Sequence, residues 1–168
     1  LLHEQKADIV IGGLPERSKG LEHAPLFKFE IMAVLPQNSA LRSKTRLSAD
    51  DFSQQTLITY PVPEERIDLI RQILKPEGIR FERRTAELTV AIMQLVASRR
   101  GLAALPNWGI QSYVEHEYVI AKPIGKKGLW SELHAIAKAD VLLRPYAKDL
   151  VKIIRDTCAE RLEGIRLL

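Results

Sequence analysis

The sequence has one cysteine, few aromatic residues and no long hydrophobic run. Because Cys158 stands alone among 168 residues, the chain has no internal disulfide, and this composition is typical of a reducing compartment. A membrane-spanning helix needs roughly 18 consecutive apolar residues, and no stretch approaches that length. No secretory leader is recognisable at the start of the chain. We therefore expect a cytoplasmic protein without a membrane partner.

The sequence also lacks a concentration of charge of one sign. It carries 25 Lys and Arg against 21 Asp and Glu, and the two signs are interspersed, as in Glu64-Glu65-Arg66. A nucleic-acid-binding module would instead gather basic residues along one element. The 46% hydrophobic content is ordinary for a globular domain with one sizeable core. These features favour a solvated surface of mixed sign, with no nucleic-acid contact by this segment.

No group of residues has the pattern of a catalytic, metal or cofactor site. The four histidines are scattered without metal-ligand spacing: His3, His23, His116 and His134. Cys158 lies on an apolar helical stripe, which favours a packed side chain over a nucleophile. Gly12-Gly13 lacks the GxGxxG context and the Lys-Ser/Thr of a phosphate loop, so it indicates only a turn. The sequence therefore predicts a protein that is not an enzyme.

Apolar periodicity predicts strands that alternate with helices through the middle of the chain. Strands are expected over residues 7–13, 21–26, 30–35, 56–60, 80–84, 102–105, 118–121 and 132–138, the polar one at 80–84 near a sheet edge. Helices are expected over residues 48–54, from 64 to a stop at 76–78, over 88–99, after 108, and from about 145. Gly101 is expected in the left-handed position that closes the third of these helices.

Three of the predicted helices have an apolar face that we expect to be buried. These faces comprise Ile67, Ile70 and Leu74 with Ile73 beside them; Leu88, Ile92, Leu95 and Val96; and Leu150, Ile153, Ile154, Cys158 and Leu162. The short helix near residue 50 has Ser48 as its N-cap, followed by Asp50 and Asp51, where a helix start favours acidic side chains.

The alternation of strands and helices favours an α/β fold with parallel sheet built from right-handed crossovers. Two extended stretches, 21–35 and 118–138, interrupt it, and they suit two strands that pass between two lobes. We therefore expect a two-lobed α/β fold with central sheets, a double crossover and an interlobe cleft. The expected first lobe comprises residues 1–25 and 123–168, and the second comprises residues 26–122.

The ends of four predicted strands form the candidate binding site. In open α/β sheets, ligands bind beyond the carboxyl ends of strands, near helix N-termini. The candidate effector-binding residues are Gly12, Gly13, Tyr60, Pro61, Val62, Glu87, Thr89, Asn107 and Trp108. They suit a small zwitterion, with its carboxylate on helix amides, its ammonium toward Glu87 and its tail against Tyr60 or Trp108. The alternative is that Tyr60, Trp108 and Trp130 are core residues at a domain edge.

The stretch Tyr60-Pro61-Val62-Pro63 is unusually stiff and apolar for a loop between a buried strand and a helix. A plain connector would contain Gly, Asn or Ser. We interpret this stretch as one wall of the cleft, kept open by its prolines without a loss of loop entropy. The helix that follows would direct its positive end toward a ligand carboxylate.

Two segments, Ala7 to Ile11 and Val96 to Pro106, resemble the effector-binding domain of LysR-type transcriptional regulators. Three others narrow the resemblance to the methionine-biosynthesis regulators of that family: Thr59-Tyr60-Pro61-Val62 followed by Arg66-Ile67-Asp68, Ala104 to Trp108, and Gly128-Leu129-Trp130-Ser131. The resemblance covers essentially the whole chain.

The resemblance implies a periplasmic-binding-protein-like (type 2) fold and a small-molecule co-effector, homocysteine, with no cofactor. It implies binding to promoter DNA through an N-terminal winged helix-turn-helix, assembly as a homodimer or homotetramer, and RNA polymerase as a further partner. The DNA-binding domain and the family's opening strand–helix–strand, a piece of roughly 30 residues or more, are absent from the sequence, so the first lobe is expected to be incomplete. The effector would act by a population shift between two lobe geometries.

Two other classes of protein fit parts of the pattern. A solute-binding protein of an amino-acid transport system uses the same two-lobed cleft, and a signal peptide would favour it. A transferase or dehydratase on a similar fold would need an acid, a base or a metal constellation, which the sequence does not contain. The motifs at 59–62 and 128–131 favour the regulator.

Overall fold

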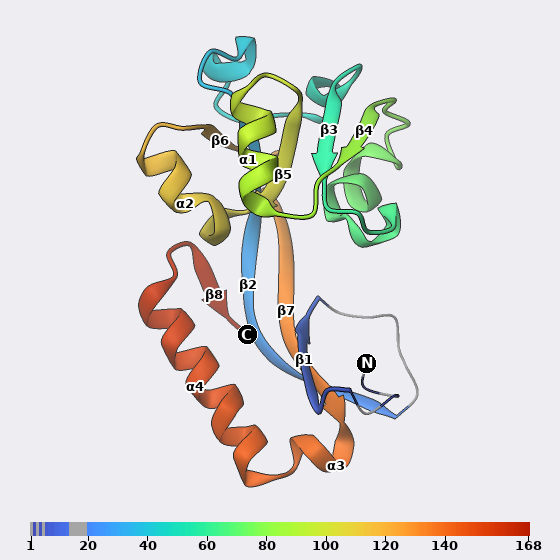
Figure 1. Ribbon diagram of the computed structural model, residues 1–168, viewed down its shortest axis with the longest axis vertical. Helices are drawn as coiled ribbons and strands as arrows, with labels where there is room; N and C mark the ends of the chain where they lie inside the picture. Colours follow the sequence, from blue (N-terminus) through green and yellow to red (C-terminus); the bar gives the residue numbers. More distant parts are fainter. Residues whose placement is uncertain (1, 3, 5, 14–19) are drawn as a thin grey trace. The chain divides into compact units, whose positions relative to one another are not determined.

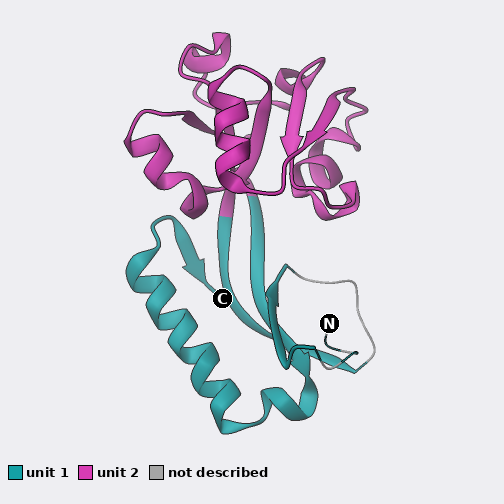
Figure 2. Cartoon of the chain, viewed as in Figure 1, with its two compact units in different colours: residues 1–29, 130–168 teal, residues 30–129 magenta. Residues whose placement is uncertain are grey.

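The computed structural model describes residues 2, 4, 6–13 and 20–168, which form two compact units (Figures 1 and 2). Unit 1 contains residues 1–29 and 130–168, and unit 2 contains residues 30–129. Two strands, β2 (Leu21–Leu35) and β7 (Leu129–Lys138), carry the chain from one unit to the other, which confirms the predicted double crossover. No helix in the described part of the chain is long and apolar enough to span a membrane.

The prediction of two separate extended pieces over 21–35 was wrong, because β2 is one continuous strand of 15 residues. Its two ends are held by different partners. Phe27–Phe29 pairs with β8 (Ile165–Leu167), and Ile31–Val34 pairs with β5 (Leu102–Pro106). Hydrogen bonding on both sides of Glu30 keeps the intervening backbone extended.

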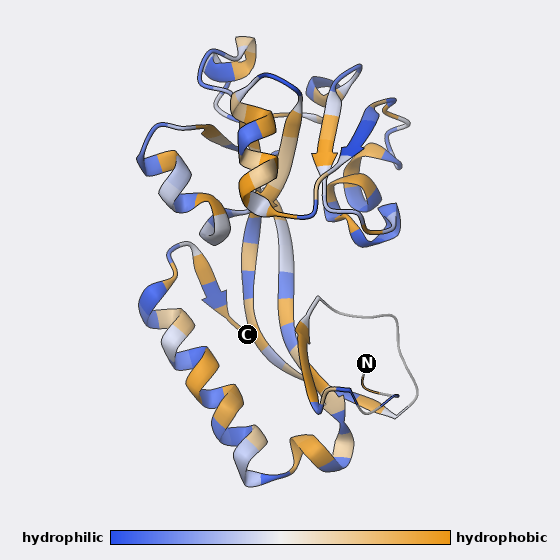
Figure 3. Ribbon diagram, viewed as in Figure 1, coloured by the Kyte–Doolittle hydropathy of each residue, from blue (hydrophilic) through white to orange (hydrophobic). Residues whose placement is uncertain are grey.

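The sheet of unit 2 is mixed and contains the parallel strands that the sequence predicts. Its strands are the end of β2, β3 (Thr56–Thr59), β4 (Glu82–Thr85), β5 and β6 (Ile120–Pro123). The order is β2-β5-β3-β4, where β3 runs parallel to both neighbours and β2 runs antiparallel to β5 and β6. β3 is apolar and central, whereas β4 is polar and lies at the edge, as predicted (Figure 3).

Two helices, α1 (Thr89–Ala97) and α2 (Asn107–Glu115), close the core of unit 2. The buried residues of this core are Val34, Ile58, Ile92, Met93, Val96, Ala103, Leu105, Ile110 and Val119. The apolar stripe predicted for α1 is partly wrong. Leu88 is 63% exposed because it is the extended N-cap residue, outside the helical turns, and Met93 takes the buried place instead.

The closing residue of α1 was also predicted wrongly. Arg99, with φ 59°, occupies the left-handed position, and the Arg100 amide donates to the Leu95 carbonyl in the hydrogen bond typical of this helix ending. Gly101 serves a different purpose. Its φ is 156°, and a Cβ built there would lie 2.3 Å from the Thr56 carbonyl oxygen. The glycine is therefore required by the close approach of two backbones where β5 begins.

The segment after Pro63 is helical but irregular, in contrast to the regular helix that the periodicity predicts. A 3-10 turn, η3 (Glu64–Arg66), is followed by a π-helical turn, η4 (Ile70–Leu74). Leu69, Ile70 and Leu74 are buried, while Ile67 and Ile73 are half-buried. The two glutamates in the 3-10 turn disfavour an anion beside its start, and the orientation of this segment toward a ligand carboxylate stays a prediction.

The other short turns of unit 2 are η1 (Ala40–Ser43) and η2 (Ala49–Phe52). The start of η2 confirms the predicted cap. The Asp51 carboxylate accepts the Ser48 amide at 2.9 Å and the Ser48 hydroxyl at 3.1 Å, and it forms an ion pair with Lys44. Burial raises the pKa of Asp51, but the hydrogen bonds from Lys44 and Ser48 and the Lys44 charge outweigh it and hold its pKa below the usual range of an aspartate.

We expect Asp51→Asn to lower the free energy of unfolding by about 1 kcal/mol at pH 7, because the cap and the ion pair are both weakened. A carboxyl whose pKa is lower in the folded state stabilises the fold above its unfolded pKa, and this contribution is lost as pH falls through its folded pKa. The difference between the two proteins should therefore shrink at acidic pH. Urea unfolding of the full-length protein at pH 7 and near pH 3 tests this, with the exposed neighbour variant Asp50→Asn as control. An equal loss in both variants would contradict it.

Unit 1 consists of β1 (Ile9–Gly12), parts of β2 and β7, β8, α3 (Ala139–Leu142) and α4 (Pro145–Arg161). β1 pairs antiparallel with β7. The apolar face predicted for α4 is only partly covered. Leu150 and Ile153 are 40% and 61% exposed, whereas Cys158 is half-buried and burial raises the pKa of its thiol.

Trp130, in β7 just after the chain enters unit 1, has two cations near its ring. Lys28 Nζ is 5.9 Å and Arg166 Cζ is 4.6 Å from its ring centroid. Cation–π contacts of this kind stabilise the ring in place. Trp130 is half-buried, and its interpretation as a core residue stays a prediction.

Candidate functional site

The carboxyl ends of the parallel strands β3, β4 and β5 lie at the same end of the unit 2 sheet, and we call this end the strand-end edge. Thr59 and Thr85 are paired in register at the ends of β3 and β4, and the Ala86 amide donates to the Thr59 carbonyl at 2.9 Å. β5 flanks β3 on its other side and leads directly into α2. Seven of the nine predicted site residues follow these three strands: Tyr60, Pro61, Val62, Glu87, Thr89, Asn107 and Trp108. The three strands are parallel neighbours, as the topological rule requires, and the role of the residues that follow them stays a prediction.

Tyr60 joins the end of β3 to the start of α1. Its hydroxyl lies 2.6 Å from the Thr89 Oγ1, and its half-buried ring packs against the core of unit 2. The core interpretation of this residue is therefore partly correct, and its role in a binding site stays a prediction. The ring contributes to packing and is only half-buried.

The stretch that follows Tyr60 is a tight turn rather than a flexible loop. The Val62 amide donates to the Tyr60 carbonyl at 2.8 Å, a bond between residues two apart that defines a γ-turn around Pro61. Proline restricts φ to about −65°, a value suited to the centre of such a turn. The stiffness that the sequence suggests therefore has a defined geometry.

Arg83 of β4 is a residue at the end of β3 whose role the sequence analysis missed. Its Nε donates to the Thr59 Oγ1 at 2.9 Å, and its Nη2 donates to the carbonyls of Tyr60 and Val62 at 3.0 and 2.6 Å. The Thr59 hydroxyl also donates to the Tyr60 carbonyl at 3.0 Å. The guanidinium thus holds the end of β3 and the turn together. Only the alternation of inward and outward residues along a polar edge strand could have indicated it.

The two helices that begin at this edge lack capping side chains. Leu88 and Pro106 are the N-cap residues of α1 and α2, and neither side chain can accept a hydrogen bond. Neither helix has an acidic residue in its first turn. The positive end of each helix dipole therefore lacks an acidic side chain within the helix's own first turn, which suits an anionic group of a ligand.

The acidic residues near this edge differ in their availability. Lys75 Nζ lies 3.1 Å from a carboxylate oxygen of both Glu64 and Glu65. The pKa of Glu65 is lowered by its own backbone amide and by Lys75, and the pKa of Lys75 is raised by the two glutamates. Glu87, in contrast, is an exposed carboxylate. Among the described residues, no three metal-ligating side chains gather into a metal site.

Gly12 and Gly13, the two remaining predicted residues, lie in unit 1. Gly12 is paired with His134 in β7, and a Cβ on Gly13 would lie 3.8 Å from the Glu132 carbonyl oxygen. His134 is 7% exposed; its Nε2 lies 3.2 Å from Glu132 Oε2, and its ring meets the His23 ring edge-on, with centroids 6.2 Å apart. His3, the first of the four histidines, lies outside the described residues.

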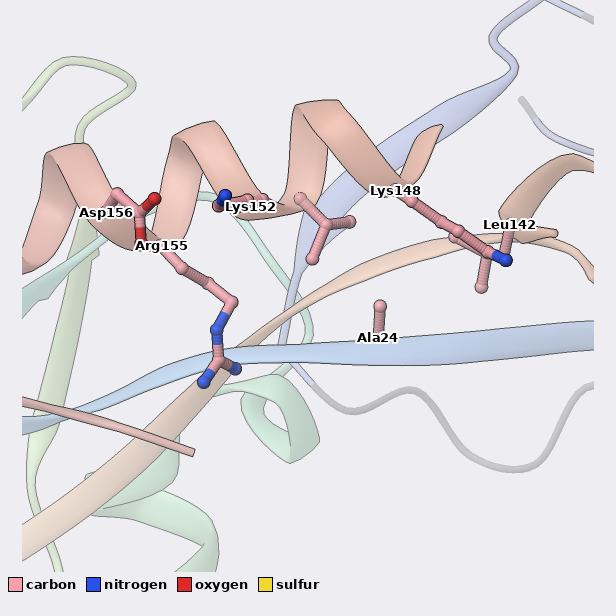
Figure 4. A pocket seen from close by; sticks show the side chains of 7 residues that line it. Ala24, Leu142, Lys148, Lys152, Arg155 and Asp156 are labelled. Carbon is pink, nitrogen blue, oxygen red and sulfur yellow. The ribbon is translucent and has the colours of Figure 1, made fainter. Parts of the chain in front are cut away.

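A surface cavity of about 250 Å³ lies in unit 1 between α4 and β2 (Figure 4). Its charged lining consists of Lys148, Lys152, Arg155 and Asp156. Arg155 reaches from α4 to β2, where it donates to the Pro25 carbonyl at 2.7 Å. None of the nine predicted residues lines this cavity, and no strand ends in it, so the strand-end edge of unit 2 remains the better candidate site.

Comparison with known proteins identifies the family of this chain. Residues 1–159 match the model of the LysR substrate binding domain. The chain is 38% identical over 168 residues to the HTH-type transcriptional regulator MetR of Haemophilus influenzae and 30% identical over 165 residues to that of Escherichia coli K12. It covers 54% and 52% of those proteins, and thus spans about half the length of the curated relatives it matches.

Solved structures agree with this match. The regulatory domain of MetR from N. meningitidis superposes with a TM-score of 0.92 at 40% identity, covering 99% of this chain and 80% of that one. The effector-binding domain of QuiR in complex with shikimate superposes at 0.77 with 19% identity, covering 96% and 76%, and shows a shared fold. The curated relatives are transcriptional regulators rather than enzymes, which confirms the prediction of a non-enzymatic protein.

Proposed function

Because the chain belongs to the LysR substrate binding domain family, we propose that it is the effector-sensing part of a regulator of methionine biosynthesis that binds homocysteine. The observation that carries this proposal is the strand-end edge of unit 2. There, a fixed aromatic residue, an exposed carboxylate and two helix starts without capping side chains are presented together. The MetR relatives are HTH-type transcriptional regulators, and they support the regulatory role in this proposal.

The edge offers a matching group for each part of an amino-acid zwitterion. The first-turn amides of α1 and α2 suit the carboxylate. Glu87 suits the ammonium group, since it is exposed on the segment between β4 and α1. Tyr60 and Trp108, both half-buried, suit an apolar tail that ends in a thiol.

Regulation would follow from differential binding. Effector bound preferentially to one arrangement of the two units shifts the regulator toward that arrangement, by no more than its difference in affinity between the two states. The full-length protein would act in the cytoplasm as a homodimer or homotetramer, and would contact promoter DNA through an N-terminal winged helix-turn-helix, with RNA polymerase as a further partner. The relatives favour this function over solute binding for transport, because they are DNA-binding regulators.

Calorimetric titration of the full-length protein with L-homocysteine tests the proposal. We expect saturable binding of L-homocysteine, with at least tenfold weaker binding of the D-isomer, because carboxylate, ammonium and tail each have a separate partner. L-methionine and L-cysteine serve as controls for the thiol and for the chain length. Equal heats for all four compounds, or none, would contradict a homocysteine site and leave only the family standing.

A further inference from the structure

We propose that Arg83 is the positioning residue of this effector site, acting on the ligand through Tyr60. The inference rests on the proposed function, but its geometry is independent of any ligand. Arg83 lies on β4, and its half-buried side chain reaches the end of the neighbouring strand. It donates hydrogen bonds to three acceptors there, the Thr59 hydroxyl and the carbonyls of Tyr60 and Val62.

The Tyr60 carbonyl is the point at which these bonds converge. It accepts from Arg83 Nη2 at 3.0 Å, from the Thr59 hydroxyl at 3.0 Å and from the Val62 amide at 2.8 Å. A carbonyl oxygen has two lone pairs, so three donors leave this group little freedom to turn. Because one donor is a guanidinium, the network contains charge-assisted bonds, which are shorter and stronger than neutral ones.

The Tyr60 side chain is fixed at its other end by Thr89, whose Oγ1 lies 2.6 Å from the tyrosine hydroxyl. Arg83 therefore fixes the backbone of Tyr60 while Thr89 fixes its hydroxyl. A ring held at both ends is already in its binding orientation, so a ligand that contacts it loses less entropy on binding. Without Arg83, the turn and the ring would have to be ordered by the ligand.

The neighbouring residue provides a matched control. Arg84 follows Arg83 on the same edge strand, carries the same charge and is exposed on the opposite side of the strand. Arg83→Gln and Arg84→Gln remove the same charge from the same edge of the sheet. They differ only in whether the end of β3 loses its anchor.

Three measurements on the full-length protein test the inference. We expect Arg83→Gln to weaken homocysteine binding at least tenfold and Arg83→Lys to recover part of that loss, while Arg84→Gln leaves the affinity within twofold of wild type. Because Arg83 acts through Tyr60, its effect should not add to that of Tyr60→Ala in a double-mutant cycle. Amide hydrogen exchange of Val62 should be at least tenfold faster in Arg83→Gln than in Arg84→Gln when no ligand is present.

The outcomes separate the two proposals. A folded Arg83→Gln protein with wild-type affinity and wild-type exchange at Val62 would overturn the role of Arg83. A wild-type protein that binds no homocysteine, but whose Val62 exchange still depends on Arg83, would overturn the effector and not the positioning. If Arg83→Gln does not fold, Thr59→Val removes one of its acceptors at nearly constant volume; weakened binding in that variant supports the inference, and unchanged binding contradicts it.

Discussion

Gly101→Ala is expected to lower the free energy of unfolding by roughly 3 kcal/mol or more. At φ 156°, an added Cβ would lie 2.3 Å from the Thr56 carbonyl oxygen. No side-chain rotation can relieve this distance, because the backbone sets the position of the Cβ and the oxygen is itself a backbone atom. Either β5 must move away from β3 or the alanine must adopt a strained conformation. Both changes disturb the parallel pair Leu57 and Leu102, which lies directly beside this glycine.

A second glycine makes the test specific to that contact. Gly109 lies within α2, and a Cβ built there meets no atom within 4 Å. Gly109→Ala should therefore be neutral or stabilising by up to about 1 kcal/mol, because alanine favours the helix and restricts the unfolded chain. Urea unfolding of the full-length protein measures both variants, and equal midpoints for the two would show that the approach at Gly101 is not rigid.

The main features of the fold, and the strand ends that carry the candidate site, could be predicted because both follow from the order of strands and helices along the chain. Strand and helix alternation fixes parallel pairing, and parallel strands necessarily end at one edge. Tyr60 and Asn107 could therefore be predicted to follow neighbouring strands, although they are 47 positions apart in the sequence. The two strands that carry the chain between the units, β2 and β7, could be predicted because the sequence has two long extended stretches without helices.

What could not be predicted depends on register and on neighbours distant in the sequence. Arg83 reaches Tyr60 only because Thr59 and Thr85 are paired across β3 and β4, and the sequence does not specify that pairing. Helix ends were unreliable for a related reason. Backbone hydrogen bonds close α1 at Arg99 without a glycine. Gly101 is needed instead because the backbone of β3 lies beside it, and hydrophobic periodicity does not predict that neighbour.

Burial on helices was also harder to predict than helix existence. Leu88 fits the apolar period of α1, yet it is exposed because the helix starts one residue later. The period of α4 identifies the helix correctly, but the exposed Leu150 and Ile153 belong to its uncovered side within the described residues. A hydrophobic period gives the direction of a helix face, while the amount of surface covered depends on the surrounding elements.

Tyr60→Ala is expected to weaken homocysteine binding at least tenfold, equivalent to about 1.4 kcal/mol, while the unfolding midpoint changes comparatively little. The reason is the position of the ring at the strand-end edge. It is half-buried, so truncation removes only part of a core contact, whereas the ligand would lose its aromatic partner and the hydroxyl fixed by Thr89. Parallel calorimetry and thermal unfolding of the full-length protein separate the two effects.

A conservative variant and a core variant bracket this result. Tyr60→Phe keeps the ring and removes only the hydroxyl contact to Thr89, so its affinity should lie between those of wild type and Tyr60→Ala. Ile92→Val, in the buried core of the same unit, should lower stability by about 1 kcal/mol without a change in affinity. If Tyr60→Ala instead loses stability as a core truncation does and its affinity falls only in proportion to unfolding, Tyr60 is a packing residue. The carboxylate and ammonium partners at the helix starts would then have to account for recognition without it.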